Sequence, residues 1–379
     1  MLKRTCLFST HQKAGGKLIE FGGWEMPVQY TSITDEHLAV RNAAGIFDIS
    51  HMGEVTVSGA AAADFLNYIF TNDIRKISAG QGQYTLMCND RGGVIDDLYV
   101  YCLSRGVYFL VVNASRVQDD VAWLQQQLHA FPRREEVFMT DASHNYSAVA
   151  VQGPRVKDFI DQCVAGPSNC ALRVPKVTDL KKNEIGGFVF NNHDVMVSRT
   201  GYTGEDGFEV YAPPDHAEPL WNKILDAGKT GTPTGVLPCG LAARNTLRLE
   251  AGMALYGNEL DESTTLLEAN LGWICKLDKG DFIGREALAR QKAEGVKRKL
   301  AGFEIVERGI ARDHQDVVVA GQRVGTVTSG SPAPFLKKNI GFAYLPIEFA
   351  SVGQEIQIDV RGKLVGAQVV KAPFYKRAK

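Results

Sequence analysis

The chain has 379 residues, of which 45% are hydrophobic and 22% are charged. This composition is typical of a soluble globular protein and excludes collagen-like, coiled-coil and disordered chains. Its 42 lysines and arginines balance its 43 aspartates and glutamates, which argues against nucleic-acid binding through bulk electrostatics. The length allows two or three domains.

No stretch approaches the roughly 20 apolar residues that cross a bilayer, and the first ten residues lack the apolar segment of a secretory signal. We therefore expect a cytoplasmic protein without a membrane or nucleic-acid partner. The seven cysteines are scattered, form no CxxC pair and mostly have apolar neighbours. This pattern predicts buried, reduced thiols.

Helix-like and strand-like runs alternate along the first part of the chain, which predicts an α+β fold. The expected helices include two with predicted N-caps, Thr34 and Ser115. The helices are predicted at 35–44, 60–70, 114–129, 217–227 and 238–252. The strands are predicted at 84–88, 94–103, 107–112, 145–151, 187–197 and 208–211.

The pattern changes after the charged stretch 285–299, where short β-type runs alternate with glycine turns. These runs predict a small all-β barrel or sandwich. They lie at 300–306, 316–320, 323–329, 340–344, 354–360 and 364–371. We therefore predict a first region over 1–284, made of two interleaved subdomains with the second around 50–140, and a barrel domain over 285–379.

Several common catalytic motifs are missing from the sequence. Gly228-Lys229-Thr230 lacks the first glycine of a P-loop, because position 223 is lysine, and no GxGxxG follows a strand. The eight histidines include no HExxH or other ligand spacing, so we expect no bound metal. Ser50 and His51 are adjacent, which points their side chains apart, and no GxSxG elbow supports a hydrolase triad.

Two adjacent aspartates, Asp96 and Asp97, interrupt the apolar strand VIDDLYVYCL. Aspartate is rare in strands, so its presence needs a reason. Alternation places Asp97 on one face with Tyr99 and Tyr101, and Asp96 on the other. One interpretation is a solvated residue at a turn beside a structural acceptor. The other is a carboxylate that orients or deprotonates an N–H of a ligand.

The segment SRTGYTGEDGFEVY (198–211) carries three glycines at every third position. Such glycines allow a ligand to approach the backbone closely, or they form a tight hairpin. Glu209 and Tyr211 share one strand face, with Phe208 on the other. Glu209 is therefore either a solvated hairpin residue or a carboxylate that pairs with N–H groups of a flat heterocycle.

Arg244 and Arg248 lie four residues apart in PCGLAARNTLRLEAG (238–252), hence on one helix face. Their stems can simply cover apolar surface. Alternatively, the guanidinium groups anchor a carboxylate of a ligand or Glu209.

Seven stretches, in order, resemble the aminomethyltransferase family, the T-proteins of the glycine cleavage system. The resemblance extends over nearly the whole chain, from about residue 3 to 375. The matching words are FGGWEMPVQY, HLAVRNAAGIFDISHMGE, GQYTLMCNDRGGVIDDLYVY, RTGYTGEDGFEVY, GLAARNTLRLEAGMALYGNEL, LGWICKLDKGDFIGREAL and SGSPAPFLKKNIGFAYLP.

The resemblance implies a multi-domain folate-binding fold, with a ferredoxin-like unit and a C-terminal all-β barrel. It implies three domains around a central hole that binds tetrahydrofolate. The implied reaction moves the methylene of an aminomethyl group on the lipoyl arm of H-protein to tetrahydrofolate. The products are 5,10-methylenetetrahydrofolate, ammonia and dihydrolipoyl H-protein, and the P- and L-proteins are the other members of the system.

The resemblance also assigns roles to single residues. Asp97 matches the key aspartate that holds and polarises N10 of the folate, and Glu209 matches the carboxylate on the pterin edge. The other matching ligand-site positions are Tyr84, Asn113, Tyr202, Arg244 and Trp273. Tyr375 corresponds to a C-terminal tyrosine of some members, although the tail PFYKRAK is shorter here. Lys337 and Lys338 are candidates for binding the folate glutamate tail.

Three other functions fit the same resemblance less well. A folate-dependent demethylase of a small methylated sulfur or nitrogen compound would keep Glu209 without needing H-protein. The folate-binding protein of iron–sulfur assembly has a cysteine where this chain has Asp281. A tRNA-modifying GTPase would need the P-loop that is missing.

Overall fold

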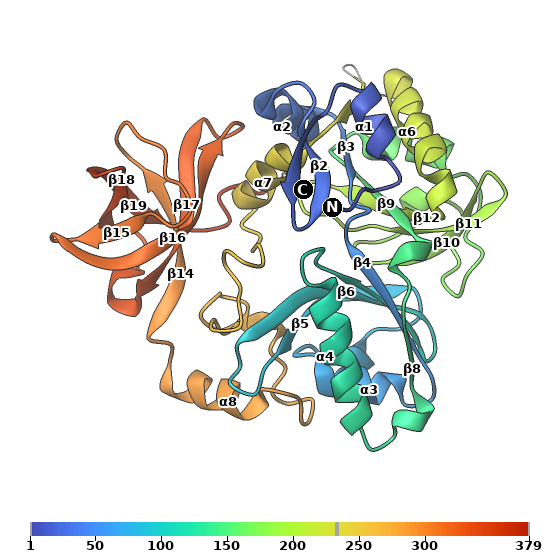
Figure 1. Cartoon of the computed structure of the whole chain (residues 1–379), viewed down its shortest axis with the longest axis horizontal. Helices are drawn as coiled ribbons and strands as arrows, with labels where there is room; N and C mark the ends of the chain where they lie inside the picture. The colour runs from blue at the N-terminus through green and yellow to red at the C-terminus, as the bar shows by residue number, and fades with distance from the viewer. Residues whose placement is uncertain (1, 232–234, 378–379) are drawn as a thin grey trace. The chain divides into compact units, whose positions relative to one another are not determined.

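The computed structural model describes residues 2–231 and 235–377 (Figure 1). Its contacts divide the chain into two compact units. The first comprises residues 1–85 and 97–244, and the second comprises residues 86–96 and 245–379. The predicted domain boundary at residue 285 does not coincide with the division into these two units, and it stays a prediction.

The five predicted helices are present to within a few residues, but two predicted caps are wrong. Three other α-helices, Phe8–Lys13, Ile160–Cys163 and Arg285–Glu294, were not predicted. Ser32, not Thr34, caps its helix by accepting a hydrogen bond from the Asp35 amide at 3.0 Å. The helix expected to begin with Ser115 starts later and has no side-chain cap. The α-helices are α1 Phe8–Lys13, α2 Ile33–Asn42, α3 Ala62–Ile69, α4 Val117–Ala130, α5 Ile160–Cys163, α6 Ala217–Gly231, α7 Leu241–Glu250 and α8 Arg285–Glu294. Single 3-10 turns are η1 Ile74–Lys76, η2 Arg134–Glu136, η3 Ser143–Asn145, η4 Val156–Asp158, η5 Val177–Asp179, η6 Pro214–His216, η7 Gly272–Ile274 and η8 Ile347–Phe349.

A five-stranded sheet with the order β5-β6-β7-β4-β8 contains the three strands predicted between residues 84 and 112. Its strands are β4 Gly53–Ser58, β5 Gln81–Cys88, β6 Val94–Ser104, β7 Val107–Val112 and β8 Phe138–Asp141. With α3 after β4 and α4 after β7, the strands β6-β7-β4-β8 have the ferredoxin-like arrangement that the resemblance implied. Figure 1 shows α3 and α4 together against this sheet.

The two faces of the five-stranded sheet differ in what covers them. A Cβ on Gly53 of β4 would lie 2.5 Å from Val117 of α4, so Gly53 and Val55 face the helices. Val55 pairs with Leu110, which in turn pairs with Val100 of β6. Strand alternation therefore places the even-numbered residues of β6 on the helix-covered face, and the odd-numbered residues on the open face.

The second sheet has six strands in the order β10-β11-β12-β9-β3-β13. One strand predicted over 187–197 is wrong, because a hairpin turns there at Asn191 and Asn192, which have φ of 49° and 63°. Asparagine tolerates this left-handed conformation. The strands are β3 Gly45–Asp48, β9 Ser147–Gln152, β10 Ile185–Phe190, β11 His193–Ser198, β12 Gly207–Ala212 and β13 Leu237–Pro238. A separate hairpin pairs β1 Lys17–Phe21 with β2 Trp24–Gln29.

The core of the first unit lies on one face of the six-stranded sheet. Phe208 and Val210 of β12 are fully buried there in one cluster with Trp221 and Ile224 of α6. The alternate residues Glu209 and Tyr211 consequently project from the other face. This is the face assignment that the alternation of SRTGYTGEDGFEVY predicted.

The second unit contains the predicted barrel, closed in the order β14-β17-β16-β15-β18-β19. All six predicted β-type runs correspond to one strand each. The strands are β14 Arg298–Ile305, β15 Asp316–Val319, β16 Gln322–Ala333, β17 Lys338–Pro346, β18 Glu355–Val360 and β19 Lys363–Val370. Buried aliphatic residues and Phe303 fill the interior.

Two expectations from composition can be compared with the structure. All seven cysteines are free, and five of them are buried, whereas Cys6 is exposed and Cys170 is intermediate. Within residues 2–231 and 235–377, no helix is long and apolar enough to span a membrane.

Candidate active site

Asp97 of β6 lies on the open face of the five-stranded sheet, where its carboxylate accepts hydrogen bonds from two neighbouring residues. The Tyr84 hydroxyl of β5 donates to Oδ2 at 2.7 Å. The Asn113 amide, just beyond β7, donates to Oδ1 at 3.0 Å and to the Asp97 carbonyl at 3.0 Å. Asp97 is partly exposed, whereas Asp96 is fully buried on the other face. The carboxylate is thus oriented by the Tyr84 and Asn113 donors and is partly exposed.

Three tyrosines, Tyr84, Tyr99 and Tyr101, form a row on the same face of the sheet as Asp97, and we call this row the tyrosine ladder. The rings of Tyr84 and Tyr99 lie 6.0 Å apart, and those of Tyr99 and Tyr101 stack at 5.6 Å. At the end of the ladder, the Tyr101 hydroxyl lies 2.9 Å from the hydroxyl of Thr200, in the loop between β11 and β12. Tyr101 is fully buried, whereas Tyr84 and Tyr99 are partly exposed and offer aromatic surface that a flat ligand can contact.

Glu209 of β12 is the second carboxylate of the site. Thr200 donates to its Oε2 at 2.6 Å, and the Tyr211 hydroxyl donates a longer bond to the same oxygen at 3.4 Å. Burial raises the pKa of Glu209, while the Thr200 bond, the charge of Arg244 and the Tyr211 bond oppose that rise. Its strand neighbours Ala150 and Ser198 are small, which leaves space around the carboxylate.

Arg244 of α7 supplies the positive charge beside Glu209. Its guanidinium carbon lies 4.7 Å from the centre of the Tyr202 ring, within cation–π distance. Burial lowers the pKa of Arg244, and the nearby Tyr202 and Glu209 oppose this. Its Nη1 is buried and has no hydrogen-bond partner among the described residues. Of the two arginines on α7, only Arg244 belongs to this cluster, because Arg248 pairs with Glu259 at 2.7 Å inside the second unit.

The loop that carries Thr200 and Tyr202 is held on three sides. Arg199 and Asp206 close its base through two parallel hydrogen bonds, Nε to Oδ1 at 3.0 Å and Nη2 to Oδ2 at 2.6 Å. The buried Gln152 amide donates to the Thr200 carbonyl at 3.0 Å. A Cβ on Gly201 would lie 1.9 Å from Gln152 Oε1, so a larger residue here would displace the Gln152 side chain that holds the loop.

The third support of this loop is Arg41 of α2, whose side chain is fully buried. Its Nη1 donates to the Thr203 carbonyl at 2.7 Å and to Glu205 Oε1 at 2.8 Å. The loop is therefore rigid before any ligand binds, which reduces the entropy cost of binding.

Five of the predicted ligand-site residues lie with Asp97 in the first unit. They form two groups: Tyr84 and Asn113 on the Asp97 carboxylate, and Tyr202, Glu209 and Arg244 around the second carboxylate. Trp273 belongs to the second unit, in η7, with 62% of its surface exposed. Its role at the site stays a prediction.

The predicted roles of Tyr375 and Lys338 also concern the second unit. Tyr375 packs against Phe335 with the ring centres 5.3 Å apart, and its amide donates to the Glu250 carbonyl. Lys338 pairs with Glu304 at 2.8 Å. Neither contact tests a role in folate binding.

Thr200, Arg41 and Gln152 are parts of this site that sequence reasoning missed. Thr200 binds Glu209 across a hairpin loop, and the period of a strand or helix does not predict such a contact. Arg41 and Gln152 act from elements more than 40 residues away from the loop. The only sequence signal for the loop was its glycine spacing.

Glu54 of β4 is a buried carboxyl on the same open face, in one row with Val111 and Tyr99. It is 1% exposed, and neither carboxyl oxygen has a hydrogen-bond partner among the described residues. Burial raises the pKa of Glu54 well above its ordinary value, and Asp141 adds to the rise. The folded protein therefore keeps Glu54 protonated at pH values where the unfolded chain ionises it.

We expect Glu54→Gln to stabilise the protein above about pH 4.3, where an unfolded glutamate ionises. The wild type should lose stability as the pH rises above that value until the folded carboxyl also ionises, and the glutamine variant should not. The gain should grow by about 1.4 kcal/mol for each pH unit above the unfolded pKa, until the folded carboxyl also ionises. Thermal unfolding at pH 4, 6 and 8 measures it. Glu205→Gln is the matched control, because it removes a charge paired with Arg41 and should destabilise. Equal stability of wild type and Glu54→Gln at pH 8 would contradict the protonated state.

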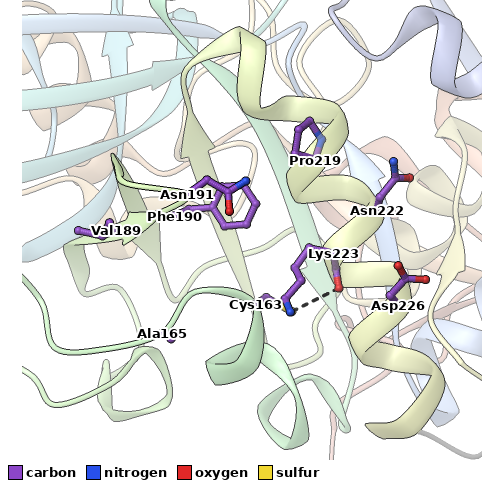
Figure 2. A pocket seen from close by; sticks show the side chains of 9 residues that line it. All are labelled: Cys163, Ala165, Val189, Phe190, Asn191, Pro219, Asn222, Lys223 and Asp226. Atoms are coloured by element: carbon purple, nitrogen blue, oxygen red, sulfur yellow. Dashed lines mark hydrogen bonds between the residues drawn. The ribbon is translucent and has the colours of Figure 1, made fainter.

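A hollow of about 450 Å³ lies elsewhere in the first unit, between the β10–β11 turn and α6 (Figure 2). Cys163 is its potentially reactive residue, but burial raises the pKa of its thiol to about 12. Its Sγ is 3.9 Å from the Lys223 carbonyl. A thiol held in its neutral form is a poor nucleophile, so this hollow does not compete with the Asp97 site.

Among the residues that the structure describes, no group of three or more histidine, cysteine, aspartate or glutamate side chains is placed to hold a metal ion.

Two family models match the chain. The model of the GCVT N-terminal domain matches residues 7–279, and that of the glycine cleavage T-protein C-terminal barrel domain matches residues 298–376. An aminomethyltransferase of Desulfitobacterium hafniense is 46% identical over 381 residues, covering 99% of both chains. One of Lysinibacillus sphaericus is 45% identical over 378 residues, covering 100% of this chain and 99% of the relative.

A solved structure is similar along the same length. The crystal structure of the glycine cleavage system aminomethyltransferase T from Bartonella henselae matches with a TM-score of 0.89 and 33% identity. The match covers 99% of each chain.

Proposed function

This chain belongs to the glycine cleavage T-protein family of aminomethyltransferases, and from that premise we propose the reaction and the roles of its residues. The chain transfers the methylene of an aminomethyl group, carried on the lipoyl arm of H-protein, to tetrahydrofolate. The observation that supports this most is the pair of carboxylates, Asp97 and Glu209, at the two ends of one tyrosine ladder.

Tetrahydrofolate fits the Glu209 end of the site by its hydrogen-bonding pattern. A pterin presents adjacent N–H donors, which one carboxylate can accept in parallel. The unpartnered Nη1 of Arg244 offers a charged donor close to that carboxylate. The partly exposed rings of Tyr84 and Tyr99 supply aromatic surface for the flat ring.

Asp97 serves the reacting end of the folate. Tyr84 and Asn113 hold its carboxylate in place, so it can accept a hydrogen bond from N10 and stabilise positive charge as it develops on the methylene. In the balanced reaction the C–N and C–S bonds of the aminomethyl thioether break, and the methylene is bonded to N5 and N10. The two protons released from N5 and N10 end on the thiolate and the departing amine, which leaves as ammonia.

The family works within the glycine cleavage system, and we propose lipoyl H-protein as the direct partner, with the P- and L-proteins acting on the same carrier. The proposed compartment is the cytoplasm. The role of H-protein follows from the substrate, since the aminomethyl group must be delivered as a covalent adduct.

A coupled assay tests the proposal. Purified protein, aminomethylated H-protein and tetrahydrofolate are mixed, and ammonia and 5,10-methylenetetrahydrofolate are measured together. Both products should appear in equal amounts and depend on each substrate. Turnover of dimethylsulfoniopropionate or methylamines, with no ammonia from H-protein, would overturn the proposal in favour of a demethylase.

A further inference from the structure

His51 lies in the turn before β4 and has no role in the chemistry described so far. Its ring is 3% exposed and packs edge-to-face against Phe21 of β1, with the ring centres 5.8 Å apart. Its Nδ1 is buried and has no hydrogen-bond partner among the described residues. Such an orphaned nitrogen costs stability unless a ligand satisfies it.

His51 follows β3, whose Phe47 pairs with Ala150 of β9, and Ala150 pairs in turn with Glu209. Burial is the main cause that lowers the pKa of His51 to about 4, while the charge of Asp48 opposes this fall and the charge of Arg244 contributes to it. His51 is therefore neutral at physiological pH. Arg244 itself has a buried nitrogen, Nη1, without a hydrogen-bond partner among the described residues, contacts the Tyr202 ring and interacts with the charge of Glu209. His51 Nδ1 and Arg244 Nη1 are thus two buried nitrogens without a hydrogen-bond partner in the described part of the chain, on the side of the sheet from which the Glu209 carboxylate projects.

We propose that His51 is a specificity-determining residue, whose Nδ1–H donates together with Arg244 Nη1 to a carbonyl oxygen of the heterocycle that Glu209 binds. The proposal rests on the proposed folate function, and in a pterin that oxygen is the 4-oxo group beside the N–H that Glu209 accepts.

Charge complementarity favours a carbonyl over other ligand groups. Arg244 is a cation with only donors, so an ammonium or amino group beside it would be repelled. A neutral imidazole can present one N–H, which suits an acceptor oxygen already bound by the guanidinium. With a 4-amino pterin, both nitrogens would stay unpaired, and such a loss discriminates ligands strongly.

The test compares binding of tetrahydrofolate and its 4-amino-4-deoxy analogue by fluorescence titration. The wild type should bind the oxo compound more tightly, by about 10-fold to 100-fold. In His51→Asn, the amide nitrogen takes the place of Nδ1, and the preference should remain within about threefold of wild type. In His51→Gln, the amide lies one bond further out, and the preference should fall by about 10-fold.

His216→Gln is the matched control. His216 also carries a buried Nδ1 without a hydrogen-bond partner among the described residues, but its ring centre lies 4.0 Å from that of His193, at the β10–β11 turn. This variant should keep the wild-type preference.

The possible outcomes separate the inference from the proposed function. If the wild type does not bind tetrahydrofolate, the proposed function fails, and the inference fails with it. If the wild type binds and discriminates, but His51→Gln discriminates equally, only the inference is overturned. Equal weakening of both ligands in His51→Gln would show a structural role and would also overturn it. Loss of discrimination in His51→Gln but not in His51→Asn supports it.

Discussion

Replacing Asp97 with asparagine should lower kcat by about 100-fold to 10,000-fold, the range typical for loss of a positioned acid–base group. The variant keeps the shape of the side chain but loses its charge. Its amide can accept from Tyr84 or from Asn113, but not from both on equivalent oxygens. Affinity for tetrahydrofolate should change by less than about tenfold, because Glu209 and Arg244 lie at the other end of the ladder. Single-turnover ammonia release and a folate titration measure the two quantities separately.

Asp96→Asn is the matched control for this experiment, because it changes the neighbouring residue on the opposite face of β6. Asp96 is fully buried, so its variant should lose stability rather than kcat. Tyr84→Phe keeps the carboxylate and removes one donor, and it should lower kcat less than Asp97→Asn. A greater loss of kcat in Asp96→Asn than in Asp97→Asn would show that the face assignment is wrong.

Much of this site could be predicted because strands alternate regularly. A period of two placed Asp97 with Tyr99 and Tyr101, and Glu209 with Tyr211, and the structure has each pair on one face. The same local rule, together with glycine turns, predicted the six barrel strands. Such predictions succeed because they depend on neighbours within one strand.

The features that were missed depend on contacts between distant segments or on the conformation of one or two residues. Arg41 contacts the Thr203 carbonyl across 162 positions of sequence, and nothing in α2 alone marks it. The sequence predicts one strand across the hairpin at Asn191, because the residues on both sides are equally β-like. The chain turns there through the left-handed conformation of two asparagines. The orphaned nitrogen of His51 is likewise visible only once its surroundings are known.

Replacing Glu209 with alanine should weaken tetrahydrofolate binding by at least about 100-fold, because two charge-assisted hydrogen bonds to the pterin edge are lost. The ionised carboxylate accepts both bonds, whereas the protonated form accepts fewer. Since burial raises the pKa of Glu209, affinity should be high above that pKa and fall as the pH drops through it.

The hydrogen bond from Thr200 to Glu209 allows a second test of the role of this carboxylate. It lowers the pKa of Glu209, so Thr200→Val should move the midpoint of the affinity-versus-pH curve upward while leaving the plateau at high pH nearly unchanged. Tyr211→Phe is the matched control, since it removes the longer bond of 3.4 Å to the same oxygen and should shift the midpoint less. Fluorescence titrations of tetrahydrofolate between pH 5 and 9 would measure both shifts. A downward shift in Thr200→Val, or unchanged affinity in Glu209→Ala, would mean that the pterin is bound by other residues.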